Sequence, residues 1–258
     1  MPVISLNGHD IYYEDHGPVD HPPVILLHHG LGTVQSWREQ VPALLEAGLR
    51  VVVYDRWGYG GSAPRPALDL PTFAADVADL RALLAHLDIS RPALIGHSDG
   101  GTLALYYAAQ FPGQAACLVT IAAHIYVEPS IPPGVQAVGE QYRHNARFRQ
   151  GLRRLHGEQV DQTFHNWYDG WCALEGVAWD MRPVLALITC PALVVQGMQD
   201  EHATPQHALD IAAAIPGAEL WLLEGARHML PQEHATAFNQ RLLQFFETCA
   251  YLARSYVR

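Results

Sequence analysis

The sequence predicts a doubly wound α/β fold, built on a mostly parallel sheet of about eight strands. Short continuous apolar runs recur along the 258 residues, and amphipathic stretches of helical length separate them. Runs of this length suit strands that are buried on both faces of a sheet. The alternation of strands and helices, joined by right-handed connections, then places helices on both faces. A chain of this length can bury a sizeable core.

The elements can be assigned in chain order. The first segment, VISLNGHDIYYE, alternates apolar and polar residues around Asn7-Gly8, so it predicts two strands joined by a two-residue hairpin turn. The buried strands are expected in the segments PPVILLHH, RVVVYD, RPALIGH, CLVTIAA, PALVVQG and AELWLLEG. The main helices are expected at 71–87, at 101–111 and from 231 to about 253.

One long segment interrupts this alternation. Residues 125–188 contain no clear strand, but the stretches EQYRHNARFRQGLRRLHG and DQTFHNWYDGWCALEG have helical patterns. A loop of that length without structure of its own is uncommon in a compact domain. The sequence therefore predicts a helical cap at 125–188, inserted into a core made of 1–124 and 189–258.

The pattern G-H-S-D-G at 96–100 lies where a predicted strand changes directly into a helix. In such a turn the serine backbone is strained and its glycine neighbours must lack side chains. The turn lifts the Ser98 hydroxyl above the sheet edge and points the Asp99 N–H, at a helix N-terminus, toward the same space. The alternative is a tight turn with an inert serine.

A serine hydroxyl needs a base to become a nucleophile, and the base needs an acid to orient it. On this architecture the acid and then the histidine follow later strands. Asp200 follows the strand PALVVQG, with Glu201 as the second candidate, and His228 follows AELWLLEG. His234 lies nearby but within the predicted final helix. Ser98, His228 and Asp200 are therefore the predicted catalytic residues.

The loop HHGLGTVQSW after the first of the buried strands should supply a second oxyanion donor. Gly30 and Gly32 let its backbone approach a ligand closely, and the N–H of Leu31 is the predicted donor. His28 and His29 could be metal ligands, but no third ligand accompanies them at a suitable spacing. We therefore expect these histidines to pack within the loop, and we expect no metal.

Together these segments resemble the α/β-hydrolase fold superfamily in order and spacing. The matching pieces are HHGLG, YDRWGYGGS, GHSDGG, QGMQDE and GARHMLPQE. The resemblance implies that Ser98 is the nucleophile, that His228 is the general base and acid, and that Asp200 orients it. The oxyanion hole would be formed by the backbones of Leu31 and Asp99. The insertion would be the family's cap over the site, and acyl transfer to water would need no cofactor.

The predicted function is hydrolysis of carboxylic esters with small to medium acyl or aromatic groups, through an acyl-enzyme. Two alternatives keep the triad: a C–C bond hydrolase of meta-cleavage products, and a thioesterase. A ligand-binding or receptor protein on a hydrolase scaffold is a third. The resemblance also leaves lactonase, amidase and cofactor-free haloperoxidase activities open, because a fold does not fix a function.

The predicted cap offers candidates for substrate binding. Phe164, Trp167, Tyr168 and Trp171 are spaced three and four residues apart, which places them on one side of a helix. They either pack in a core or line an apolar pocket, so Trp167, Tyr168 and Trp171 are candidate substrate-binding residues, together with Gly30.

Charged residues near the predicted site allow two interpretations each. Five arginines of the cap either form a solvated face or attract an anionic substrate; they are Arg143, Arg147, Arg149, Arg153 and Arg154. The carboxylate of Asp99 favours a helix N-terminus. If that carboxylate pointed into the site, it would oppose formation of an oxyanion.

Composition narrows the classes of partner. The net charge of −10 leaves no basic stripe for nucleic acid. The four cysteines lack CxxC spacing, so free thiols in a reducing compartment are expected. No signal-peptide pattern and no run of membrane-spanning length is present, which predicts a cytoplasmic protein away from membranes. The expected partner is a small-molecule substrate, and a homodimer stays open.

Overall fold

A computed structural model describes residues 2–252, which contain one eight-stranded sheet in the order β1-β2-β4-β3-β5-β6-β7-β8. The strands are β1 (Val3–Leu6), β2 (His9–His16), β3 (Pro23–Leu27), β4 (Arg50–Tyr54), β5 (Ala93–His97), β6 (Cys117–Ile121), β7 (Ala192–Gly197) and β8 (Glu219–Leu223). Strand β2 is antiparallel to both of its neighbours, and the pairs from β4 to β8 are parallel. The predicted fold class is confirmed.

The first two strands form the predicted hairpin. Leu6 pairs with His9, which leaves Asn7 and Gly8 as the two turn residues. Their φ angles are 51° and 91°, so both residues have the positive φ that a tight hairpin turn requires.

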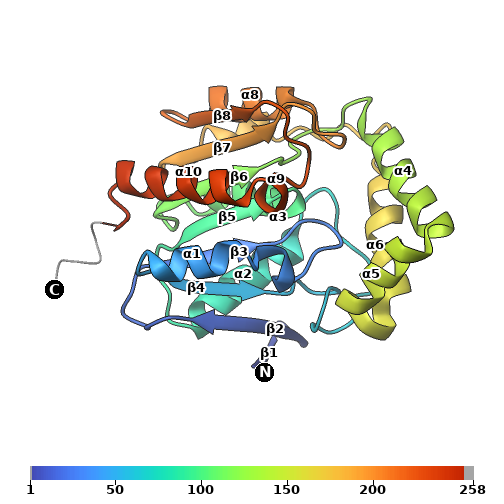
Figure 1. Ribbon diagram of the computed structural model, residues 1–258, viewed down its shortest axis with the longest axis horizontal. Helices are drawn as coiled ribbons and strands as arrows, with labels where there is room; N and C mark the ends of the chain where they lie inside the picture. The colour runs from blue at the N-terminus through green and yellow to red at the C-terminus, as the bar shows by residue number, and fades with distance from the viewer. Residues whose placement is uncertain (1, 253–258) are drawn as a thin grey trace.

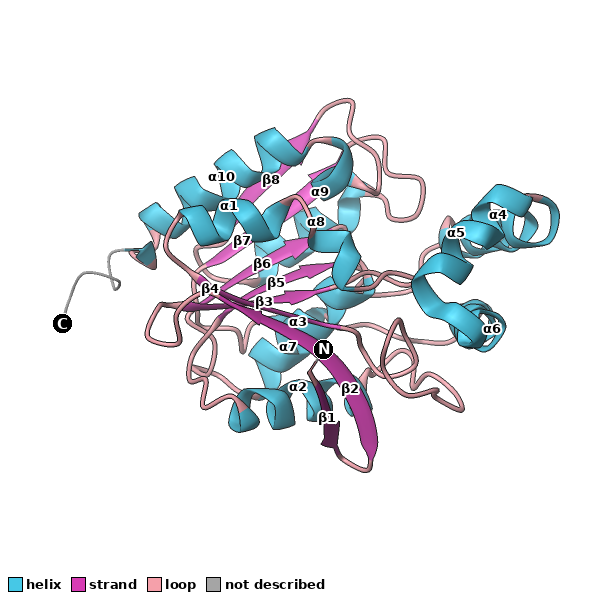
Figure 2. Ribbon diagram, turned by 60° about the horizontal axis from the view of Figure 1, so that its bottom comes forward, coloured by secondary structure: helices cyan, strands magenta, loops and turns pink. Residues whose placement is uncertain are grey.

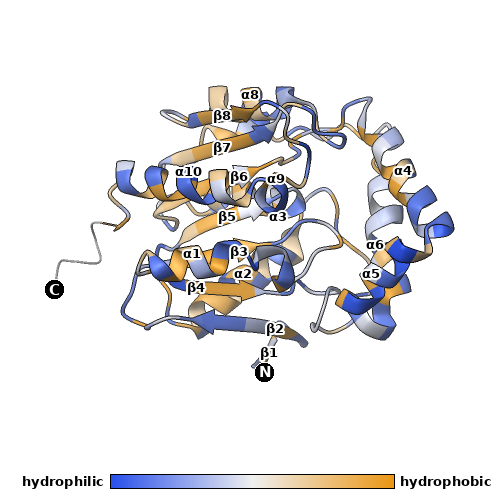
Figure 3. Ribbon diagram, viewed as in Figure 1, coloured by the Kyte–Doolittle hydropathy of each residue, from blue (hydrophilic) through white to orange (hydrophobic). Residues whose placement is uncertain are grey.

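Helices cover both faces of the sheet because neighbouring residues of each central strand point to opposite sides (Figure 2). On β4, Val52 belongs to the apolar cluster with α2 (Ala74–His86) and α3 (Asp99–Gln110), whereas Val51 and Val53 belong to the cluster with α1 (Gln40–Glu46) and α10 (Ala235–Thr248). The central strands are apolar, as Figure 3 shows. The core helices are η1 (Val34–Trp37), α1 (Gln40–Glu46), α2 (Ala74–His86), α3 (Asp99–Gln110), α8 (Pro205–Ala214), α9 (Leu230–Glu233) and α10 (Ala235–Thr248).

Two predicted helices differ in detail from the observed ones. Helix α3 begins at Asp99 rather than at residue 101, since Ser98 occupies its N-cap position. The final helix is divided at His234 into α9 and α10. The predicted end of that helix, near residue 253, lies outside the described residues.

Four helical segments between β6 and β7 form a layer at the carboxyl edge of the sheet (Figure 1). We call this layer the helical insertion: α4 (Ile131–His144), α5 (Ala146–His156), η2 (Gly157–Gln159) and α6 (Val160–Cys172). The predicted helix at 140–157 is broken at Asn145, whose side chain accepts the N–H groups of Arg147 and Phe148 and so starts a new helix. A short helix, α7 (Arg182–Leu185), then packs back onto the main core through Leu185.

The described residues also bear on the expectations drawn from composition. None of their helices is both long enough and apolar enough to cross a bilayer. The four cysteines form no disulfide within the described residues, and two of them, Cys117 and Cys190, are buried. Cytoplasmic localisation and the homodimer stay predictions.

Candidate active site

The turn between β5 and α3 holds Ser98 in a strained conformation, with φ 54° and ψ −119°. Its N–H donates to the carbonyl of Ile121 at 2.8 Å, so the strained backbone is fixed to the neighbouring strand β6. A Cβ atom at Gly96 would collide with the carbonyl of Gly100, and one at Gly100 would collide with the carbonyl of Leu27. The glycines of the G-x-S-x-G pattern are therefore required by close backbone packing.

His228 is held by a buried carboxylate on the loop after β7. Its Nδ1 lies 2.9 Å from both carboxylate oxygens of Asp200. Because a carboxylate only accepts, Nδ1 carries the proton and Nε2 is left as the basic nitrogen. Asp200 also accepts the N–H of His202 at 2.8 Å, the N–H of Ala203 at 3.1 Å and the Gln196 amide at 2.7 Å. The carboxylate is thus fixed from several sides.

The pKa values of this pair move in opposite directions. Burial opposes ionisation of Asp200, but His228 and the two backbone N–H donors hold the pKa of its carboxyl below the usual range. Burial also acts to lower the pKa of His228, yet the Asp200 carboxylate outweighs it and raises that pKa above the ordinary imidazole value. Asp200 therefore stabilises the protonated form of His228, as a histidine that accepts a proton during a reaction requires.

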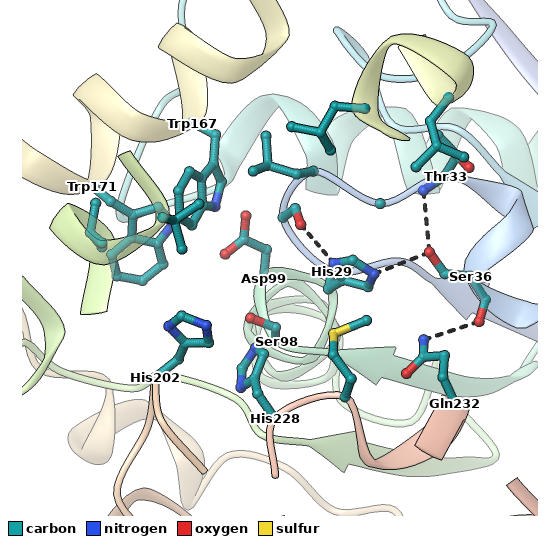
Figure 4. Close-up of a pocket in the computed structure, with 18 of the residues that line it drawn as sticks. His29, Thr33, Ser36, Ser98, Asp99, Trp167, Trp171, His202, His228 and Gln232 are labelled. Carbon is teal, nitrogen blue, oxygen red and sulfur yellow. Dashed lines mark hydrogen bonds between the residues drawn. The ribbon is translucent and has the colours of Figure 1, made fainter. Parts of the chain in front are cut away.

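Ser98 and His228 both line one cavity, and Figure 4 draws them next to each other in its wall. Glu201, the second candidate for the acid, instead accepts the backbone N–H of His228 at 3.2 Å and pairs with Arg227 at 3.3 Å. His202 lies edge-on to the His228 ring with centroids 4.8 Å apart, a neighbour that the sequence reasoning missed. The one available signal was its place two residues after Asp200.

The loop after β3 carries the other predicted donor. Leu31 has φ 60°, a left-handed conformation that is strained for a residue with a side chain, and it lines the cavity with Gly30 and Gly32. His29 donates from Nδ1 to the carbonyl of Gly30 at 2.6 Å. Within residues 2–252, neither the N–H of Leu31 nor that of Asp99 donates to a protein acceptor, so both are free to bind a ligand oxygen.

His28 packs within the loop, as expected. Its Nδ1 donates to the carbonyl of His29 at 2.8 Å, and its Nε2 accepts the N–H of Arg56 at 3.0 Å. Both ring nitrogens are thus used by the backbone. Across the described residues, no group of three or more His, Cys, Asp or Glu side chains is placed to hold a metal ion.

Asp99 lies at the N-terminus of α3 and also in the cavity wall (Figure 4). Its carboxylate is 3.4 Å from the guanidinium of Arg56, which also approaches Asp76 at 3.3 Å. Arg65 pairs with Asp76 at 2.7 Å and with Asp69. Three carboxylates therefore share two guanidinium groups. Burial raises the pKa of the Asp99 carboxyl above its usual range, although Arg56 opposes the shift.

The cavity has a volume of about 520 Å³ and is mostly apolar on the side of the helical insertion. The insertion contributes Ile131, Val135, Val138, Phe148, Leu152, Leu155, Trp167 and Trp171 to its lining. The indole nitrogen of Trp167 would collide with a Cβ atom at Gly30, so a side chain there would displace Trp167. Three of the four predicted substrate-binding residues, Gly30, Trp167 and Trp171, line the cavity.

Tyr168 is the exception, since it does not line the cavity as predicted. Its ring stacks on Phe164 with centroids 5.6 Å apart and packs against Gly139 of α4, away from the cavity lining. The four aromatic residues thus divide between two directions. Trp167 and Trp171 face the cavity, whereas Phe164 and Tyr168 face α4. A helix that packs on two partners has two apolar sides, which spacing cannot separate.

The five arginines of the insertion are exposed to solvent and do not line the cavity. Two of them have acidic partners on the same surface: Arg143 pairs with Glu140, and Arg153 pairs with Glu158 at 2.8 Å. This supports the interpretation as a solvated face.

Residues 22–160, more than half of the chain, match the family model of the alpha/beta hydrolase fold. The chain belongs to the α/β-hydrolase fold family. Its similarity to proteins named as hydrolases and esterases supports an enzyme of the hydrolase type.

Relatives of this α/β-hydrolase are named for different activities. The serine hydrolase BPHL of Homo sapiens is 30% identical over 250 residues, covering 95% of this chain and 85% of that protein. A non-heme chloroperoxidase of Streptomyces lividans is 31% identical and covers 95% of this chain and 99% of its own. The enol-lactonase of Burkholderia xenovorans LB400 superposes with a TM-score of 0.76 at 25% identity, over 95% of this chain and 100% of that one.

Proposed function

We propose that this α/β-hydrolase cleaves carboxylic esters through an acyl-enzyme on Ser98. The observation that carries the proposal is that Ser98 and His228 line the same cavity while the buried Asp200 carboxylate, 2.9 Å from Nδ1, orients the His228 imidazole. That arrangement supplies a nucleophile, a base with one fixed tautomer, and the group that stabilises its protonated form.

The mechanism follows from these roles. Nε2 of His228 takes the hydroxyl proton while Ser98 attacks the ester carbonyl, and the resulting oxyanion is bound by the N–H groups of Leu31 and Asp99. The protonated His228 then gives its proton to the leaving alcohol. Water, activated by the same imidazole, hydrolyses the acyl-enzyme. No step requires a metal or an organic cofactor.

The cavity wall favours an ester that carries a positive charge near its carbonyl. Asp99 follows the nucleophile directly in the chain, and the cluster of Asp69, Asp76 and Asp99 has one carboxylate more than it has guanidinium groups. A substrate ammonium group beside Asp99 would neutralise the extra negative charge of this cluster. It would also weaken the electrostatic repulsion between the Asp99 carboxylate and the oxyanion. The substrate we propose is therefore a small or medium ester with an amino group close to the reacting carbon.

The cavity gives less support to an anionic substrate, such as the dienoate that a C–C hydrolase would bind. Arg38 lines the cavity, but its side chain is 74% exposed and lies 3.2 Å from Glu39. Arg56 is buried behind Asp99 and is already paired. Ester hydrolysis thus fits the charges of the wall better.

The ester activity is tested with a series of p-nitrophenyl esters from acetate to long acyl chains. Wild type should show turnover with an optimum at short or medium chains, and Ser98→Ala should lose at least about 10³-fold in kcat. Ser5→Ala, an exposed serine on β1, is the control and should match wild type. Turnover that survives in Ser98→Ala would refute the assigned nucleophile.

The preference for a cation is tested with two esters of the same alcohol, one of alanine and one of propionate, which differ mainly by the ammonium group. Wild type should favour the alanine ester in kcat/KM by about 10–100-fold, the range expected for one buried charged hydrogen bond. Asp99→Asn keeps the backbone donor and should remove most of that ratio. An unchanged ratio in Asp99→Asn would show that Asp99 does not select the substrate.

A further inference from the structure

A histidine of the helical insertion reaches the oxyanion loop. His156 is the last residue of α5 and is 2% exposed. Its Nδ1 accepts the N–H of Gly60 at 3.0 Å, and its Nε2 lies 3.0 Å from the carbonyl of Leu31. Because Gly60 donates and the Leu31 carbonyl accepts, the neutral ring must carry its proton on Nε2. The imidazole therefore bridges two core loops in one defined tautomer.

The side chain of Leu31 is held by the same insertion. It belongs to an apolar cluster whose other buried members all come from the insertion; they are Tyr142, Leu152, Val160 and Phe164. Leu31 is 7% exposed although it sits on a loop of the core. The insertion thus contacts Leu31 in two ways: it packs against the side chain, and His156 donates a hydrogen bond to the carbonyl oxygen.

These two contacts restrict rotation of the Leu31 backbone from one side of its N–H, and on the other side His29 holds the Gly30 carbonyl of the same peptide at 2.6 Å. The residue is in the left-handed region with φ 60°, which a residue with a side chain adopts only when its surroundings impose it. Rotation about its backbone would swing the N–H away from the site, but it would also break the His156 hydrogen bond or expose the side chain. An oxyanion donor is effective only when it is oriented before the charge develops.

We propose that His156 is a positioning residue for the oxyanion loop, so that the helical insertion completes the catalytic site as well as covering it. The inference rests on the proposed function of Ser98 and Leu31. It gives the insertion a role in the rate of acyl transfer, separate from its role in lining the cavity.

Other hydrogen bonds join the insertion to the core without touching Leu31. Thr163 donates its hydroxyl to the carbonyl of Gly58 at 2.8 Å, and Gln159 donates to the carbonyl of Gly60 at 2.8 Å. Thr163 is as buried as His156, with 2% exposure. Thr163→Val therefore removes one buried contact between insertion and core while it leaves the oxyanion loop alone.

Two substitutions separate the two hydrogen bonds of the His156 ring, one to Gly60 and one to Leu31. In His156→Gln the side-chain amide nitrogen can reach the position of Nε2 and keep the bond to Leu31. In His156→Asn the side-chain oxygen can occupy the position of Nδ1 and keep the bond to Gly60, but the donor to Leu31 is lost. The two variants thus each keep one of the two hydrogen bonds.

The experiment measures the rate at which a fluorophosphonate labels Ser98, by intact mass, together with kcat and KM on an ester and the melting temperature. This labelling also builds negative charge on an oxygen beside Ser98. His156→Gln and Thr163→Val should stay within about 3-fold of wild type. In His156→Asn, the rate of Ser98 labelling and kcat should both fall about 10–100-fold, while KM changes little. This is the effect expected when one oxyanion donor is partly lost.

Two results would overturn the proposal: His156→Asn labels as fast as wild type, or all three variants slow equally. The labelling rate does not depend on ester turnover. If the order of labelling rates is as expected but no ester is hydrolysed, the positioning role stands and the proposed ester function fails.

Discussion

At the scale of single residues, the structure separates two acids that are adjacent in the chain. Asp200 faces the ring of His228, whereas Glu201 faces its backbone N–H. Of these two acids, only Asp200 accepts a hydrogen bond from the ring and so holds the proton on Nδ1. Their different roles make a matched pair of substitutions informative.

Asp200→Asn should lower kcat by about 10³–10⁴-fold, because an amide in that place favours the wrong tautomer of His228. The carboxylate raises the pKa of His228, so its loss should lower that pKa. Since the neutral imidazole is the base, the acidic limb of the kcat/KM profile should move to lower pH. A pH profile of initial rates measures both effects.

Glu201→Gln is the control for this prediction, because its amide oxygen can still accept the N–H of His228. This variant should keep kcat within about 5-fold of wild type. The acidic limb of its kcat/KM profile should also move to lower pH, but by less than in Asp200→Asn. An Asp200→Asn limb at or above the wild-type pH would contradict the assignment.

At the scale of elements, the turn from β5 to α3 depends on close backbone contacts. A Cβ atom at Gly100 would lie 2.7 Å from the carbonyl of His28 and would collide with the carbonyl of Leu27. Backbone atoms in a central strand cannot move aside cheaply. The turn and strand β3 must therefore shift together to admit a side chain.

Gly100→Ala should lower the free energy of unfolding by about 3 kcal/mol, the upper part of the range for overpacking. Gly151→Ala is the matched control, because Gly151 is inside α5 and an added Cβ there meets nothing within 4 Å. That variant should gain about 0.5–1 kcal/mol from better helix propensity. Urea unfolding of both variants measures the difference, and equal stabilities would contradict the close packing.

At the scale of the whole molecule, the net charge of −10 creates a field that attracts cations. For the alanine ester, kcat/KM should fall about 3–10-fold between 10 mM and 500 mM NaCl as the field is screened. The propionate ester should change little, since it carries no charge. Steady-state rates over a salt series measure both slopes, and equal slopes would show that the field does not steer the substrate.

Most of the fold could be predicted because its signals are local. Each buried strand is a continuous apolar run, and the Asn7-Gly8 turn has its own backbone requirement. The candidate catalytic residues follow strands at one edge of the sheet, so topology brings Ser98, Asp200 and His228 together.

What the sequence could not predict depends on contacts between distant segments. Tyr168 turns toward α4 rather than into the cavity, because α6 packs on two partners. His156 reaches Leu31 from 125 positions away along the chain. Asp99 joins Arg56 in a cluster that no spacing rule describes. Such contacts arise when segments that are distant in the chain pack together, within the core, within the insertion or between the two, and local patterns do not encode them.

Ser98 is expected to carry a covalent acyl group during turnover, and trapping this acyl-enzyme tests its role as the nucleophile. Wild type is mixed with excess p-nitrophenyl ester, quenched in acid within milliseconds, digested and analysed by mass spectrometry. We expect an acyl group on Ser98 in wild type and in Ser5→Ala, and none in Ser98→Ala. An acyl group on another residue, or rapid turnover with Ser98 unmodified and dispensable, would contradict it.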